Sequence, residues 1–271
     1  MLETFEIWIR DSVNQSVLIS PLMGVVFGAL FTFVTRGKRQ DGTDSVKETI
    51  IIIKEKIIIR EKSENNSKPV SNDDPWALVF VFIGAVVLAT YLYAVFADKV
   101  IYYSSLLAFN FITFGLTSIV LSAFQSKITS SDWFLYTVLP VSILTGSLIL
   151  LHYAQLGIFP GLKERAEIEG AVNLYFNVLE EKHKNWILTQ LIGLVSAVLY
   201  LMLSCVLVLH NTSALQVRYG GFMQSFWAKV FLITHRFSGW GAVLFIVAIG
   251  VVSYLALNGT GYEFLMSRRI G

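Results

Sequence analysis

The residues in this chain that could do chemistry are few, and the histidines are the first to consider. His152 lies inside a long apolar run, three residues before Gln155, whereas His183, His210 and His235 lie at the ends of apolar runs. A haem or metal site in a helical bundle needs histidines paired at matched depth on facing helices. Only His152 lies at such depth, so we expect no cofactor. His152 and Gln155 instead suggest an interhelical hydrogen bond or polar pore lining.

The motifs of hydrolases and nucleotide-binding enzymes are missing. The sequence contains no HExxH, GxSxG, P-loop or dinucleotide fingerprint. No aspartate or glutamate lies in the interior of an apolar run, which also argues against ion-coupled transport. The single Cys205 rules out a disulfide framework or a sulfur-based metal cluster, and a net charge of +2 does not suggest nucleic-acid binding. The sequence therefore predicts a protein that is not an enzyme and holds no metal.

One short motif precedes the last apolar run. The string His235-Arg236-Phe237-Ser238-Gly239 resembles the HRxSG entry of the quinone-binding membrane anchors of succinate dehydrogenases. The resemblance covers five residues, lies at the opposite end of the chain from its place in that family, and lacks the later haem histidine. It implies a quinone- or haem-associated membrane subunit, which is a minor alternative for this chain.

The elements that would position these residues are membrane helices. The chain is 55% hydrophobic and 15% charged, against about 25% charged in ordinary soluble domains. Six runs approach the roughly 20 apolar residues that a crossing requires, and backbone groups in lipid must bond within their own segment, which favours helices. The six runs are about 16–35, 76–97, 101–124, 132–158, 186–209 and 238–257. Only Asp98 and Lys99 separate the second run from the third, so we expect a tight helical hairpin there.

The predicted fold is an all-α, multi-pass membrane helical bundle of about six transmembrane helices, with one β-prone cytoplasmic segment and an amphipathic surface helix. Its units are a first segment and helix (1–35), an insert and linker (36–75), a three-helix unit (76–158), the amphipathic helix (159–185) and a C-terminal pair with an interfacial segment (186–271). Within 159–185, apolar residues at helical spacing oppose a charged face. This helix would lie on the membrane surface or on a neighbouring subunit.

Lysines and arginines on the loops predict the orientation. With the N-terminus outside, the inner loops 36–75, 125–131 and 210–236 hold thirteen of them and the outer segments hold eight. The insert 36–75 is then cytoplasmic in a cell or inner membrane. The C-terminal Arg268 and Arg269 fall outside, against the rule. Either the number of helices is off by one, or the apolar piece near 222–234 is more than interfacial.

The segment from Val46 to Lys62 is the most distinctive part of the chain. As a strand it places acids on one face and bases on the other after Glu48, and it is rich in β-branched residues. No second strand exists to pair with it, so we expect it to pair with copies of itself. A local hairpin, a helix continuing the first run, or strand addition by a soluble partner are the alternatives. The predicted assembly residues are Ile50, Ile51, Ile52, Ile53, Ile57, Ile58 and Ile59.

Small and polar residues on the runs complete the predicted sites. Gly24 and Gly28 form a GxxxG pair, and Ser142 and Gly146 a small-xxx-small pair; both allow close helix approach, with packing inside one chain favoured over packing between chains. The candidates for pore lining or polar contact are Asn110, His152, Gln155 and Gln190.

Two functions from different classes follow. The first is a homo-oligomeric pore, channel-like or membrane-effector protein assembled through the isoleucine-rich segment. The second is a non-catalytic membrane anchor or scaffold that docks a soluble cytoplasmic partner. The expected partners are therefore the lipid bilayer, further copies of the chain and a soluble protein, with no nucleic acid.

Overall fold

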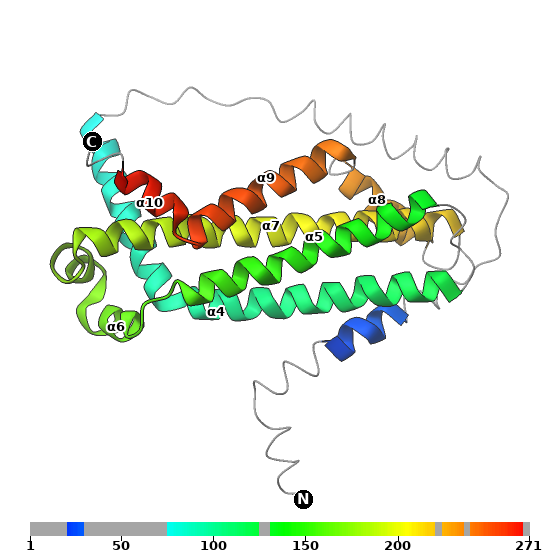
Figure 1. Cartoon of the computed structure of the whole chain (residues 1–271), viewed down its shortest axis with the longest axis horizontal. Coiled ribbons are helices and arrows are strands. Elements are labelled where there is room, and N and C mark those ends of the chain that lie inside the picture. The colour runs from blue at the N-terminus through cyan, green and yellow to red at the C-terminus, as the bar shows by residue number, and fades with distance from the viewer. Residues whose placement is uncertain (1–20, 30–74, 125–130, 220–223, 236–238, 268–271) are drawn as a thin grey trace, which may run out of the picture.

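The computed structural model describes residues 21–29, 75–124, 131–219, 224–235 and 239–267, and the elements in these ranges are helices (Figure 1). Residues 21–29 form a short helix. The others are α4 (Pro75–Phe124), α5 (Ser131–Leu156), α6 (Leu162–Asn173), the π-helical η1 (Leu174–Val178), α7 (Glu181–Tyr219), α8 (Gln224–Thr234), α9 (Trp240–Leu257) and α10 (Thr260–Ser267). The isoleucine-rich segment lies outside the described residues, so its strand remains a prediction.

The helix α7 is the centre of the bundle. It contacts α4, α5, α8 and α9, and Figure 1 shows α5, α9 and the second part of α4 running along it. The side chains with almost no exposed surface include Leu144 and Leu151 of α5 and Ile187 and Leu201 of α7. Half of the most apolar window of α7 is buried, against 22% for α9, because α7 has neighbours on most sides.

Among the residues that the structure describes, four helices are long and apolar enough to cross a membrane. Their apolar stretches are Phe80–Leu121 (42 residues), Thr137–Leu156 (20), Glu181–Ala214 (34) and Trp240–Leu257 (18). Large apolar side chains also cover their outer faces; Phe82 is 70% exposed and Leu244 is 67% exposed. Apolar surface this extensive is unusual on a soluble monomer. The described part of the chain is therefore all-helical and compatible with a membrane protein.

The predicted hairpin at Asp98 and Lys99 is wrong, because α4 is one continuous helix of 50 residues. Neither residue is a helix breaker, and no glycine or proline stands beside them to stop the helix. Both side chains are exposed, and the Lys99 ammonium lies 5.6 Å from the centre of the Phe96 ring. In Figure 1 the cyan first part of α4 runs in a different direction from the blue-green second part. The predicted two helices are thus two parts of one bent helix.

The predicted amphipathic helix at 159–185 is interrupted. Gly161 precedes α6 in the left-handed region (φ 74°), and Gly170 inside α6 has φ 73° and ψ 171°, so the helix breaks there before η1. The residues that α6 and η1 bury are Leu162, Ala166 and Leu174. At the far end of the bundle, α8, which covers most of the apolar piece near 222–234, packs on α7.

Candidate functional site

Among the described spanning stretches, the outward side of α5 carries exposed serine, threonine, histidine and glutamine side chains. In the described part of the chain its exposed residues follow 3-4-3-4 spacing, which puts them on one side of a helix. They are Ser142, Thr145, Ile149, His152 and Leu156, with Gln155 at the edge. The hydroxyls of Ser142 and Thr145 donate to the carbonyls of Val138 (3.0 Å) and Val141 (2.9 Å) in the preceding turn.

The outward side of α7 makes a matched comparison. Apart from Glu181 and Lys182 at its start, the exposed residues of its spanning stretch are Ile192, Val195, Leu199 and Met202, which have the same spacing and are all apolar. On α4 and α9 the exposed polar residues within the described spanning stretches are Asp98, Lys99, Trp240 and several tyrosines. Exposed serine, threonine, histidine and glutamine therefore belong to α5 alone among these four stretches.

Two of the predicted polar contacts lie on this α5 face, and the other two do not. His152 and Gln155 are exposed, and the ring of His152 lies 6.4 Å from that of Tyr153. Asn110 on α4 donates from Nδ2 to the carbonyl of Leu106 (3.0 Å). Gln190 on α7 is fully buried and donates from Nε2 to the carbonyl of Leu257 in α9 (3.0 Å). The structure therefore does not bring the four predicted residues together.

The predicted packing glycines lie at close contacts within the chain. A Cβ on Gly24 would lie 2.6 Å from the carbonyl oxygen of Asn110, and one on Gly28 would lie 2.9 Å from Thr117 of α4. Gly146 similarly faces the hydroxyl of Tyr200, at 2.9 Å from its added Cβ, whereas Ser142 is exposed.

Buried polar side chains join the helices at positions that sequence reasoning missed. The Tyr200 hydroxyl of α7 donates to the carbonyl of Ile143 in α5 (2.7 Å), and the Ser253 hydroxyl of α9 donates to the carbonyl of Gly193 in α7 (2.9 Å). The sequence does not reveal the acceptor of either bond, because each acceptor is a main-chain carbonyl on another helix. The signal that could have found them is a lone polar side chain in an apolar run.

A further buried polar contact joins α7 to α8. His210 is 6% exposed, and its Nδ1 lies 3.0 Å from the Thr234 hydroxyl. Its ring stacks on Phe231, with centroids 4.9 Å apart, and lies 6.1 Å from the ring of His235. Two of the three histidines predicted at the ends of apolar runs, His210 and His235, thus lie close together, but the described residues contain no cluster of three metal-ligating side chains.

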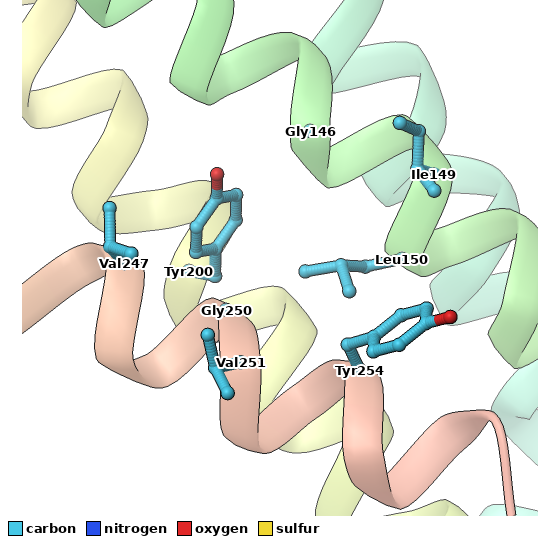
Figure 2. Close-up of a pocket in the computed structure, with 8 residues that line it drawn as sticks. All are labelled: Gly146, Ile149, Leu150, Tyr200, Val247, Gly250, Val251 and Tyr254. Atoms are coloured by element: carbon cyan, nitrogen blue, oxygen red, sulfur yellow. The ribbon is translucent and has the colours of Figure 1, made fainter.

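A groove of about 290 Å³ lies between α5, α7 and α9 (Figure 2). Tyr200 comes from α7, and Figure 2 shows Leu150 of α5 pointing toward it. Gly146 and Gly250 keep the groove open, since a Cβ on either would lie 2.9 or 2.8 Å from Tyr200. The remaining lining residues are Ile149, Val247, Val251 and Tyr254.

The comparisons with known proteins add no family. No protein-family model matches the chain, and neither a curated protein nor a solved structure is significantly similar to it.

Proposed function

We propose that the chain is a multi-pass integral membrane protein without catalytic activity that works as a homo-oligomeric, pore-like assembly. The polar face of α5 carries this proposal. It would turn toward neighbouring copies and a shared water path, while the apolar faces of α7 and α9 would meet lipid.

The directions of the helices support repeated crossing. The helices α5 and α7 are antiparallel, because Ile143 bonds with Tyr200 whereas the later Gly157 bonds with the earlier Trp186. The helices α7 and α9 are also antiparallel, because Gly193 bonds with Ser253 whereas the earlier Gln190 bonds with the later Leu257. Figure 1 shows the second part of α4 ending at the end of the bundle where α5 begins. Successive helices thus alternate in direction, as successive crossings must.

The loop charges favour a single crossing by α4. With one crossing, residues 36–75, 159–185 and the C-terminus share a side and hold fifteen of the 21 lysines and arginines, whereas the N-terminal segment, 125–131 and 210–236 hold five, and Lys99 lies within α4. The six-crossing arrangement splits the charges thirteen to eight. Since positive loops face the cytoplasm, we place 36–75, α6 and the C-terminus there. This side assignment removes the misfit of Arg268 and Arg269.

The cost of polar groups in lipid explains why the α5 face would need a neighbour. Ser142 and Thr145 satisfy their donors within the helix. His152 and Gln155 are larger, and hydrogen bonds between membrane helices contribute about 0.6 to 2 kcal/mol each. A second copy or a water path supplies partners that hydrocarbon does not. The alternating 3-4 spacing is also the spacing of helix–helix seams.

A membrane anchor that docks a soluble partner is the second candidate, and one observation favours it. Ile168 (81% exposed), Val172 (66%) and Phe176 (54%) are exposed apolar side chains on α6 and η1, outside the candidate spanning stretches. In the proposed topology these side chains are cytoplasmic. The isoleucine-rich segment is cytoplasmic in both proposals. It would pair with further copies of itself in the pore, or with a strand of the soluble partner in the anchor.

Ion flux from liposomes tests the proposal. The purified full-length protein, reconstituted alone, is expected to release a trapped ion. Cysteines at Thr145 and His152, in a Cys205→Ala background, should react with a charged, water-soluble thiol reagent, and the reaction should reduce the flux.

The matched controls are Val195→Cys and Leu199→Cys on the apolar face of α7, which should neither react nor alter the flux. Equal reactivity of the α5 and α7 cysteines, or a reconstituted protein that releases nothing, would contradict the pore. Co-purification of a soluble protein, lost on replacing Ile168 and Val172 with serine, would favour the anchor instead.

A further inference from the structure

We propose that the groove between α5, α7 and α9 binds one hydrocarbon chain of a membrane phospholipid, and this inference rests on the membrane location proposed above. The occupant follows from where the groove lies. Gly146 and Leu150 fall within the spanning stretch of α5, Tyr200 within that of α7, and Val247 to Tyr254 within that of α9. In the proposed membrane location, the groove at this position faces the hydrocarbon chains of the bilayer.

The lining of the groove selects hydrocarbon over a polar ligand. Its walls are aliphatic apart from two tyrosine rings. The hydroxyl of Tyr200 already donates to the carbonyl of Ile143 at 2.7 Å, so its donor is used within the protein. Apart from the Tyr254 hydroxyl at one end of the groove, the lining offers no further side-chain hydrogen-bond donor, so polar parts of a ligand would lose hydration here.

The size and polarity of the groove orient the chain. Its volume of about 290 Å³ is at the lower limit of ordinary ligand pockets, about 300 to 1,000 Å³, so one chain fits rather than a whole lipid. Tyr254 lies one turn before the end of α9 and is 39% exposed. Tyrosines are enriched at membrane–water boundaries. The headgroup would therefore lie at the Tyr254 end and the methyl end near Val247.

The two glycines show that the groove is built into the packing. Both Gly146 of α5 and Gly250 of α9 face the same ring, that of Tyr200. Larger residues at these places would push against Tyr200 and close the space. The exposed lining residue Val251 (52%) can be enlarged without that conflict, and its neighbour Val252 (54%) has the same type and exposure but lies outside the groove.

Photolabelling tests the proposal on the full-length protein in phospholipid liposomes. The probe is a phosphatidylcholine with a diazirine midway along one chain, and mass spectrometry locates the adducts. Leu150 is only 6% exposed, so an adduct there needs a chain inside the groove, whereas Ile192 (55%) reports lipid around the bundle. Val251→Trp should abolish the Leu150 adduct and leave the Ile192 adduct. Val252→Trp should leave both.

Three results would overturn the inference: no Leu150 adduct in the wild-type protein, an unchanged Leu150 adduct in Val251→Trp, or disulfide crosslinking of Val251→Cys between copies in place of labelling. A protein that labels at Ile192 but not at Leu150 is in the membrane with an unoccupied groove, so only this inference fails. Absence of both adducts would instead contradict the membrane location.

Discussion

Tyr200 lies where α5, α7 and α9 meet, and it has two separate roles. Its hydroxyl bonds the main chain of α5 at Ile143, and its ring packs against Gly146 and Gly250. The ring fixes the spacing of the three helices and forms a wall of the groove. The hydroxyl contributes one interhelical hydrogen bond. The two roles can be separated by replacing tyrosine with phenylalanine.

We expect Tyr200→Phe to lower the free energy of unfolding by about 1 kcal/mol, because the carbonyl of Ile143 loses a buried donor while the ring remains. Thermal unfolding in mild detergent measures the effect. The control is Tyr254→Phe, whose hydroxyl is on a half-exposed residue near the end of α9. An equal loss in both variants would show that the hydrogen bond of Tyr200 has no particular value.

Gly157 and Gln190 form a tight contact between the end of α5 and α7. An added Cβ at Gly157 would lie within van der Waals overlap of Gln190 Oε1, while Gln190 Nε2 bonds the carbonyl of Leu257. We expect Gly157→Ala to destabilise the protein by about 1–3 kcal/mol through overpacking.

A double-mutant cycle checks this contact. Gly157→Ala combined with Gln190→Ala should cost less than the two single changes added together. The control is Gly84→Ala, since Gly84 has no neighbour within 4 Å of an added Cβ. Strict additivity of Gly157→Ala and Gln190→Ala would show that the two residues do not press on each other.

Sequence reasoning found Gln190 because glutamine stands out in an apolar run, but it could not find the bond that Gln190 makes. Its acceptor, the carbonyl of Leu257, carries no side-chain signal, and the contact depends on the relative shift of α7 and α9. The same holds for Ser253 and Gly193. The polar residues of a membrane bundle can be recognised from sequence, whereas their partners depend on tertiary packing.

At the scale of elements, composition located the apolar helices well. The runs at 132–158 and 238–257 correspond to α5 (Ser131–Leu156) and α9 (Trp240–Leu257), and 186–209 lies inside the longer α7. The division of α4 was wrong because charge was taken as a sign of a turn. A helix ends where its backbone is stopped, and an aspartate beside a lysine does not stop it. Which face of α5 is exposed could not be predicted either, because helical periodicity in the sequence does not say which side of a helix is buried.

The start of α9 offers a test of backbone strain. Gly239 precedes the helix with φ 95°, a conformation that residues with a Cβ rarely adopt, and no side chain crowds it. We expect Gly239→Ala to cost about 1–3 kcal/mol. Gly241 is inside α9 with equally open space, so Gly241→Ala should stabilise the helix by up to about 1 kcal/mol. Equal effects of the two alanines on thermal unfolding would contradict a strained helix start.

At the scale of the whole molecule, the side of each loop depends on how often α4 crosses. A single crossing places residues 36–75 and α6 on one side, whereas a hairpin would place them on opposite sides. We therefore expect Lys47→Cys and Arg165→Cys, in a Cys205→Ala background, to react with a membrane-impermeant maleimide only after cells are permeabilised. Lys229→Cys of α8 should react in intact cells.

The two arrangements give different results in this labelling. Six crossings predict that Arg165→Cys reacts in intact cells and Lys229→Cys does not. Labelling of Lys47→Cys and Arg165→Cys on opposite sides would show that α4 crosses the membrane twice. The three cysteines together therefore measure both the count at α4 and the orientation of the bundle.

The shortness of α9 has a consequence for the lipid itself. At 1.5 Å per residue, the 18 residues of α9 and the 20 of the α5 stretch reach about 27 and 30 Å, close to the roughly 30 Å hydrocarbon core. The 34 residues of α7 reach about 51 Å, so in the proposed membrane location α7 would project or tilt. As the bilayer thickens, α9 would therefore be the first helix to become shorter than the hydrocarbon core. Unfolding temperature in phosphatidylcholines of increasing chain length should fall once the bilayer exceeds the length of α9, so membrane thickness would select where this protein is most stable.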